Sequence, residues 1–291
     1  MAEKNARSVP VLMYHHITPS SGQITTSPQN FESQMAALAA NGYTSLTAGQ
    51  FAGYLQGETV PEKSVLITFD DGYLDNYVYA HPVLQKYGMN AVMFLVTDWA
   101  GQGELRPVDG SGKPLPACPS HHECKEIVAA GKANDIAVRW SEVQAMEAAG
   151  TFEIHCHTHT HTRWDLNFDR AGKCAGIAND LQQSKAALLQ ELNKNSPHLC
   201  WPQGYFDDDY IQAAQALGFS IFYTTDAYGF NVAGGNPQYI YRIAVRNKPG
   251  AWLIHRIGIA KNPYWGPLYN RWKKFRKQRR RAREIRRANT A

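Results

Sequence analysis

Val65-Leu66-Ile67-Thr68-Phe69-Asp70-Asp71-Gly72 is the stretch that decides the fold. A short apolar run that ends in two carboxylates and a glycine is typical of a strand buried on both faces. In folds made of buried parallel strands, the chemistry lies where the strands end. Asp70 and Asp71 are therefore candidate site residues.

Similar apolar runs recur along the chain, and helical patterns separate them. We expect further strands over residues 9–14, 91–96, 152–154 and 219–224, and helices over 141–149, 180–192 and 210–217. Strands that alternate with helices predict βα units and a parallel sheet. Residues 101–120 are rich in glycine and proline and are expected to form an inserted loop, which is part of a longer insertion over 101–138.

The composition is that of a globular α/β protein. Of 291 residues, 44% are hydrophobic and 19% are charged. No run of 18 apolar residues occurs, so no membrane-spanning helix is expected. The first seven residues are polar and do not resemble a signal peptide.

The five cysteines are an odd number scattered along a long chain, which does not suggest a disulfide framework. This favours a reducing compartment, although a bridge between Cys118 and Cys124 in an oxidising one stays open. We expect a location in the cytoplasm or at the inner face of the membrane. The alternative is the periplasm, if a signal peptide has been removed.

Positive charge is concentrated near the C-terminus. Residues 271–287 hold eleven Lys or Arg and one Glu, a net charge of +10, so the rest of the chain carries −5 of the total of +5. Such a tail is expected to be solvated or to bind an anionic membrane surface or a glycolipid, whereas nucleic acid is a weaker candidate. The expected division is a catalytic domain over 1–261, followed by a linker and basic tail over 262–291.

His157 and His161 lie four residues apart in a histidine-rich segment. Two imidazoles on one ion place their nitrogens about 3.3 Å apart, whereas residues i and i+4 of a straight strand are about 13 Å apart. A shared ion therefore requires the chain to turn after His157. The segment also fits adventitious metal binding, and His155 and His159 alternate with the two candidates, so spacing alone does not fix which pair is used.

Two adjacent carboxylates at a buried strand end repel each other unless a cation lies nearby. If Asp71 joins His157 and His161, two imidazoles and one carboxylate leave open coordination positions, as in a catalytic zinc site. Asp70 is then free to accept a proton. The alternative is that both aspartates serve the N-terminus of a following helix.

Several motifs together resemble the polysaccharide deacetylase (NodB-homology) family, carbohydrate esterase family four. Their order is Pro10-Val11-Leu12-Met13-Tyr14-His15, then Thr68-Phe69-Asp70-Asp71-Gly72, then Trp140-x-x-Val143-x-x-Met146, then Glu153-Ile154-x-x-His157-Thr158-x-x-His161. The resemblance covers roughly residues 9–260 and is strongest toward poly-N-acetylglucosamine deacetylases.

The resemblance implies a distorted (β/α) barrel of about seven parallel strands. It also implies Asp70 as catalytic base, Asp71, His157 and His161 as metal ligands, and Thr158 as a support for their loop. Zn²⁺ is the expected ion, with Co²⁺ or Ni²⁺ as alternatives.

The chain departs from the family pattern in two places. Cys200 stands where the family has an arginine that orients the base, so that arginine is expected to be absent. Leu253-Ile254-His255 fits the pattern that supplies the general acid in much of the family, although His255 could equally be an ordinary histidine of a strand. His15 is the alternative proton donor.

Aromatic residues near the expected strand ends are candidates for sugar binding. Tyr73, Trp201, Pro202 and Tyr205 are expected to contact the substrate, although core or groove-wall positions fit them as well. The sequence as a whole favours removal of N-acetyl groups from an N-acetylglucosamine-containing polysaccharide or envelope glycan. An O-acetyl esterase of the xylan type and a non-catalytic glycan-binding relic are the alternatives.

Overall fold

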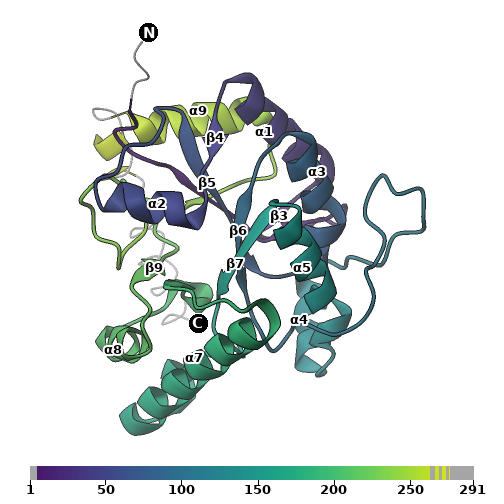
Figure 1. Ribbon diagram of the computed structural model, residues 1–291, viewed down its shortest axis with the longest axis vertical. Helices are drawn as coiled ribbons and strands as arrows, with labels where there is room; N and C mark the ends of the chain where they lie inside the picture. The colour runs from purple at the N-terminus through teal and green to yellow at the C-terminus, as the bar shows by residue number, and fades with distance from the viewer. Residues whose placement is uncertain (1–4, 263–265, 269–270, 273–274, 276–291) are drawn as a thin grey trace, which may run out of the picture.

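The computed structural model describes residues 5–262, 266–268, 271–272 and 275. A curled sheet of parallel strands occupies its centre, in the order β10-β1-β5-β6-β7-β8-β9, with β4 beside β5 (Figure 1). The strands are β1 (Val11–Tyr14), β4 (Thr44–Ser45), β5 (Ser64–Asp71), β6 (Ala91–Leu95), β7 (Phe152–Cys156), β8 (His198–Cys200), β9 (Ile221–Tyr223) and β10 (Ile243–Ala244). A separate two-stranded sheet pairs β2 (His16–Ile17) with β3 (Thr25–Thr26).

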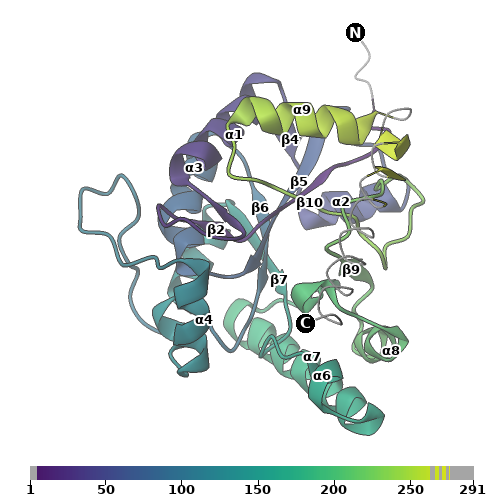
Figure 2. The same ribbon diagram turned by 180° about the vertical axis from the view of Figure 1, so that it is seen from behind.

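Helices surround this sheet, as two opposite views show (Figures 1 and 2). They are α1 (Pro28–Ala40), α2 (Ala48–Leu55), α3 (His81–Lys86), α4 (His121–Ala129), α5 (Trp140–Ala148), α6 (Trp164–Asn167), α7 (Arg170–Leu192), α8 (Asp208–Ala216) and α9 (Gly250–Lys261). Short π- and 3₁₀-helical turns cover Asn76–Ala80, Ala133–Asp135 and Pro202–Gly204. The predicted distorted (β/α) barrel of about seven parallel strands is confirmed.

β5 shows how the sequence builds this barrel. All eight of its residues are buried, as expected for a parallel strand covered on both faces. Side chains alternate between faces, so Val65, Ile67 and Phe69 pack in the large core beneath the outer helices. Leu66 packs in a second core that includes residues of α2. Thr68 and Asp70 share the face of Leu66 and therefore place polar groups inside the barrel.

The expectation of a strand around His255 is wrong. Residues Gly250–Lys261 form α9, which packs against α1. Leu253 and Ile257 are buried at a spacing of four residues, as on one face of a helix, and His255 lies exposed between them.

The division of the chain at residue 261 stays a prediction. Most of the basic segment 271–287 lies outside the described residues. All five cysteines are free thiols, including Cys118 and Cys124. Within the described ranges, no helix is long and apolar enough to cross a membrane.

Candidate active site

β5 ends in the two carboxylates that the sequence singled out. Asp70 and Asp71 are buried, with 2% and 5% of their surface exposed. Asp71 has a φ of 77°, in the left-handed region, and Gly72 follows with a φ of 82°. The positive φ favours glycine at position 72, and a Cβ there would also force the Leu95 side chain, 2.3 Å away, to move. A left-handed aspartate costs roughly 1–3 kcal/mol, and such strain is often found at functional sites.

The chain also turns sharply after β7, as a shared ion requires. Thr158 and His161 have φ values of 65° and 62°, and the Thr158 hydroxyl accepts a hydrogen bond from the His161 amide at 3.1 Å. Asp180 on α7 accepts from the amides of His159 and Thr160 at 2.9 and 2.8 Å. The loop is therefore held from both sides, and Thr158 has the supporting contact that the resemblance implied.

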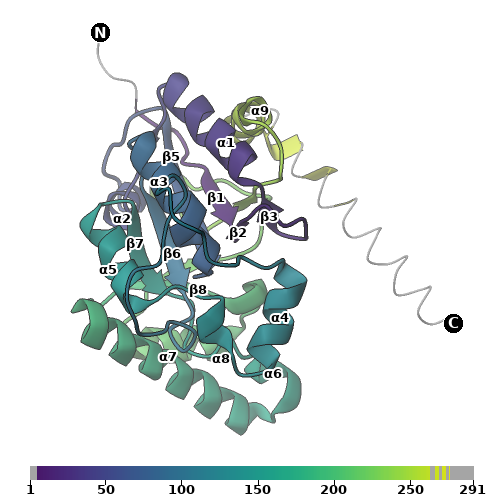
Figure 3. The same ribbon diagram turned by 90° about the vertical axis from the view of Figure 1, so that its right-hand side faces the viewer.

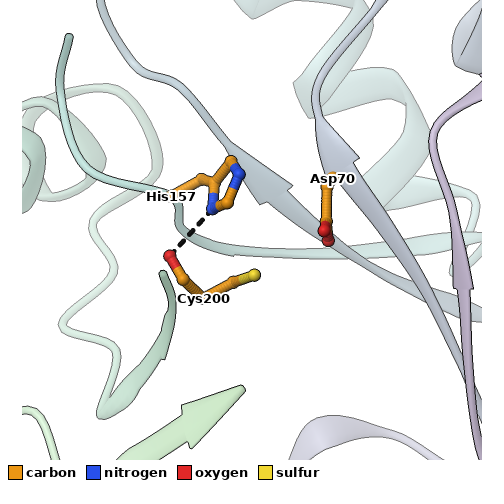
Figure 4. Close-up of side chains that lie close together, drawn as sticks. All are labelled: Asp70, His157 and Cys200. Carbon is orange, nitrogen blue, oxygen red and sulfur yellow. Dashed lines mark hydrogen bonds between the residues drawn. The ribbon is translucent and has the colours of Figure 1, made fainter. Parts of the chain in front are cut away.

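This turn brings His157 and His161 to Asp71. The Nε2 atoms of His157 and His161 lie 3.2 and 3.5 Å from Asp71 Oδ1. The Nδ1–H of His157 donates to the carbonyl of Cys200 at 2.8 Å (Figure 4), which leaves Nε2 as the ligating nitrogen. An outer hydrogen bond of this kind commonly orients a metal-binding histidine.

The donor set fits a divalent ion. One ligand atom from each of Asp71, His157 and His161 lies within 4.8 Å of the others, and the two measured separations are close to the roughly 3.3 Å expected around a shared zinc ion. Two imidazoles and one carboxylate leave coordination positions for water and substrate. The assignment of these three residues as ligands stays a prediction that the geometry favours.

A second group, formed by Asp70, His157 and Cys200, also has its donor atoms within 4.8 Å (Figure 4). A metal ion does not suit it, because the guanidinium of Arg242 already contacts Asp70 and lies 3.0 Å from the Cys200 sulfur. A second cation there would meet a fixed positive charge.

Arg242 is the functional residue that the sequence did not reveal. It is fully buried, and its two terminal nitrogens donate to the two oxygens of Asp70 at 2.6 and 2.8 Å. Its Nε donates to the carbonyl of Thr224 at 2.7 Å. The expectation that no arginine orients the base is therefore corrected, because Arg242 reaches Asp70 from the segment just before β10, whereas Cys200 occupies the expected position.

These contacts set the charge of each group. Burial opposes ionisation of Asp70, but Arg242 outweighs it and holds the pKa of Asp70 below its usual value. Burial also opposes ionisation of Asp71, yet His157 and His161 keep its pKa well below normal. Burial lowers the pKa of His161 to about 4, so at neutral pH His161 is uncharged and offers a lone pair.

His157 behaves differently. Burial lowers its pKa, but the contacts with Cys200 and Asp71 outweigh burial and raise the pKa well above the usual value. A proton and a metal ion therefore compete for its Nε2.

His15 stands on the other side of Asp70. Its Nε2 lies 3.6 Å from Asp70 Oδ2, and 16% of its side chain is exposed. Burial lowers the pKa of His15, which makes its protonated form a stronger acid.

A pocket of about 510 Å³ opens above these groups. Asp70, Asp71, His15, His157 and His161 all line it. The remaining lining residues are Ile24, Tyr73, Trp99, His121, Lys125, Val128, Ala129, Trp201, Gln203 and Thr225.

The four predicted sugar-binding residues divide into two pairs. Tyr73 and Trp201 line the pocket, but they are 3% and 0% exposed and form its wall. Pro202 and Tyr205 are not among the described lining residues. Tyr205 packs instead under the Arg163 guanidinium, 4.3 Å from its ring centroid. Trp99, which the sequence did not single out, is a further aromatic residue of the wall.

His255 is not brought to this site. It lies on the exposed side of α9 and is not one of the described residues around the pocket. Its predicted role as general acid therefore lacks the geometry it needs, whereas His15 lies beside Asp70, the predicted base.

Comparison with known proteins agrees with this geometry. The model of the family described as polysaccharide deacetylase matches residues 57–222. The Bacillus subtilis protein YxkH, which is named as a polysaccharide deacetylase, is 31% identical over 255 residues, covering 85% of this chain and 74% of its own length. A poly-β-1,6-N-acetyl-D-glucosamine N-deacetylase of Staphylococcus aureus is 26% identical over 244 residues, covering 80% of this chain and 71% of its own length.

A solved structure shares the fold. IcaB from Ammonifex degensii superposes with a TM-score of 0.67 at 24% identity, covering 90% of this chain and 98% of that one. The matched family model spans more than half of the chain and includes Asp70, Asp71, His157 and His161. On the strength of that match and of the similarity to YxkH, this chain belongs to the polysaccharide deacetylase family.

Proposed function

We propose that this deacetylase is a divalent-metal-dependent hydrolase that removes N-acetyl groups from a polysaccharide containing N-acetylglucosamine. One observation carries the proposal: Asp70, kept ionised by Arg242, lies beside the donor set of Asp71, His157 and His161. The similarity to a poly-β-1,6-N-acetyl-D-glucosamine N-deacetylase supports the choice of substrate.

Asp71, His157 and His161 would hold the ion, and Zn²⁺ suits two imidazoles and a carboxylate, with Co²⁺ or Ni²⁺ as alternatives. Such an ion supplies Lewis acidity, which lowers the pKa of water toward about 7 and polarises a carbonyl group. The protein fixes the three donors in advance through the turn at Thr158 and the hydrogen bond from His157 to Cys200.

Asp70 acts as the general base. Its carboxylate accepts the proton of the water that attacks the acetamide carbonyl carbon. The bidentate contact with Arg242 keeps this carboxylate ionised and fixes its orientation. The arginine does not release a proton itself, because guanidinium groups stay charged in proteins.

His15 acts as the general acid. An amine is a poor leaving group unless its nitrogen is protonated as the carbon–nitrogen bond breaks, and the His15 imidazole, which lines the pocket beside Asp70, can donate that proton once its ring is protonated. After proton transfer, acetate leaves, and the sugar residue stays in the polymer with a free amino group.

An acetate-release assay tests this proposal. The protein is stripped with a chelator, reloaded with Zn²⁺, Co²⁺ or Ni²⁺, and incubated with a β-1,6-linked N-acetylglucosamine tetramer or with O-acetylated xylan. We expect metal-dependent release from the tetramer, with Asp70→Asn as the control for contaminating activity. Release from xylan alone would replace the proposal by an O-acetyl esterase, and no release from either would favour a glycan-binding relic.

The basic segment is the ground for a separate proposal about location. Its net charge of +10 would attract an anionic membrane surface or an anionic glycolipid, since each Lys or Arg near such a surface adds about 1 kcal/mol. We propose that residues 271–287 hold the enzyme at the inner face of a membrane. Co-sedimentation with phosphatidylserine vesicles, with and without residues 271–291, tests this, and equal binding by both forms would contradict it.

A further inference from the structure

Helix α4 forms one wall of the catalytic pocket. Four of its residues line the pocket, namely His121, Lys125, Val128 and Ala129, and their spacing places them on one face of the helix. This helix belongs to the segment between β6 and α5, and Figure 3 shows it beside the strands on the side away from α2.

The position of α4 is fixed at its start and along its inner side. Ser120 and Glu123 form a capping box, in which the Ser120 hydroxyl accepts from the Glu123 amide and the Glu123 carboxylate accepts from the Ser120 amide at 2.7 Å. Cys124 is buried in a third, small hydrophobic core, separate from the two cores of the barrel. The other buried residues of this core are Tyr73, Val96, Trp99, Ile136 and Ala137. The wall is therefore packed against residues that also border the metal-ligand cluster.

His121, at the start of α4, contacts the buried pair of His16 and Asp75, and the proposed mechanism uses neither of these two residues. Its Nδ1 lies 3.2 Å from Nε2 of His16, and Nδ1 of His16 lies 2.6 Å from Asp75 Oδ2. His16 and Asp75 are 0% and 2% exposed. The His16 ring also stacks on Tyr73, with 3.8 Å between centroids.

Hydrogen-bond accounting assigns the protons along this chain of groups. Asp75 also accepts from the Ile17 amide at 2.9 Å and from the Asn76 side chain at 2.7 Å, so His16 Nδ1 is the donor to its other oxygen. With a neutral His16 ring, its Nε2 is an acceptor, and His121 Nδ1 carries the hydrogen between the two rings. Burial lowers the pKa of His121 to about 4, so its ring is uncharged at neutral pH, and with the hydrogen on Nδ1 its Nε2 is an acceptor.

His121 does not belong to the metal cluster. Among the described residues, the groups close enough to hold an ion are Asp71, His157 and His161, and Asp70, His157 and Cys200. His121 lines the same pocket without joining either group. His121 therefore borders the same space as the metal-ligand cluster, where the sugar ring lies if the proposed function holds.

We propose that His121 is a substrate-positioning residue, whose Nε2 accepts a hydrogen bond from a free ring hydroxyl of the sugar that is being deacetylated. The Asp75–His16 pair holds the imidazole in the tautomer and orientation that this contact requires. The inference rests on the proposed function, and it assigns to α4 the recognition of the sugar ring rather than the chemistry at the acetyl group.

Monodeoxy analogues of the substrate test the assignment. A β-1,6-linked tetramer has free hydroxyls at C3 and C4, so kcat and KM are measured with the parent tetramer and with its 3-deoxy and 4-deoxy forms. A hydrogen bond between neutral groups corresponds to a factor of about 3 to 10. We expect His121→Ala to lower kcat/KM for the parent by this factor, and to cause no further loss on the analogue that lacks the contacted hydroxyl.

Two variants keep the test decisive. His122→Ala changes the neighbouring histidine, whose side chain is 84% exposed, and is expected to match the wild type on all three substrates. His121→Gln keeps an acceptor and is expected to recover most of the loss, which a purely structural role of the ring would not allow.

Equal losses of His121→Ala on the parent and on both analogues, or no loss at all, would overturn the assignment while leaving the proposed function standing. A wild-type protein that releases no acetate from the parent tetramer would overturn the proposed function and this inference with it.

Discussion

Asp70 and Asp71 are neighbours in sequence and are both buried, but the two sides of the site that they face are built differently. Asp70 faces a fixed cation, since Arg242 holds both of its oxygens. Asp71 faces the imidazoles of His157 and His161. One carboxylate has its counter-charge built into the fold, whereas the other has a set of donors that suits a cation from solution.

This contrast indicates different chemical roles for the two aspartate side chains. A carboxylate held by arginine stays ionised and free of metal, which suits a general base. A carboxylate beside two imidazole nitrogens has the donor set of a metal ligand, which suits the binding of a Lewis acid. Arg242 relieves the repulsion between the two adjacent buried carboxylates on the Asp70 side, and a metal ion would do so on the Asp71 side.

The largest effect is expected on the histidine side. His157→Ala removes one of three ligands, so we expect loss of the bound ion and a fall of acetate release to background. His159→Ala is the matched control, because its ring contacts the Thr97 hydroxyl at 2.9 Å rather than the cluster. Metal content and acetate release are measured together, and a fully active, metal-loaded His157→Ala protein would refute the ligand assignment.

The next effect concerns the acid beside Asp70. His15→Gln removes the proton donor for the leaving amine, which is expected to lower kcat by about 10²–10⁴ while the metal content stays at the wild-type level. The measurement is kcat at saturating substrate for both proteins. A loss smaller than about 10² would assign the proton to another group.

Arg242→Gln removes the ion pair between Arg242 and Asp70. This leaves the buried Asp70 without its counter-charge, at a cost of about 3–5 kcal/mol in the free energy of unfolding. Burial then raises the pKa of Asp70, so a larger fraction is protonated at a given pH. The acid limb of the kcat/KM profile should therefore move to higher pH, with activity recovering as the pH rises.

Arg246→Gln, at an exposed arginine four residues along the chain, is the control for that experiment and should leave both the stability and the profile in place. An acid limb at the same pH in wild type and Arg242→Gln would show that the arginine does not set the charge of Asp70.

The smallest effect is expected at His255. Its side chain lies exposed on α9, and substitutions at such surface positions usually change stability by less than about 0.5 kcal/mol. His255→Ala should keep the wild-type kcat, KM and unfolding midpoint. A loss of about 10² or more in kcat would restore His255 as the acid and would require α9 to be placed differently.

The sequence predicted the histidine side better than the arginine side for a physical reason. Asp71 ends a buried strand, and His157 and His161 lie within one short turn, so local patterns carried the signal. Arg242 and Asp70 are separated by 172 positions in the sequence, and no spacing rule connects them. The only local hint is an arginine directly before Ile243, a residue of β10, where a buried charge demands a partner.

His255 shows the opposite failure. Its three-residue family pattern suggested a general acid or an ordinary histidine of a strand, whereas Leu253 and Ile257 at a spacing of four already fit a helix buried on one face. The alternation of strands and helices predicted the parallel sheet, because that alternation is a property of the whole chain, and the resemblance to the family implied the barrel. The sequence did not predict that α4 forms a wall of the pocket, because the contacts that connect His121 to His16, and His16 to Asp75, join segments far apart in the chain.

The division of labour between the two aspartates is tested most directly by measuring bound metal and acetate release in Asp70→Asn and Asp71→Asn side by side. We predict that Asp70→Asn keeps a full complement of metal and loses turnover, and that Asp71→Asn loses both. An Asp70→Asn protein that loses its metal, or that still turns over at the wild-type rate, would contradict the account.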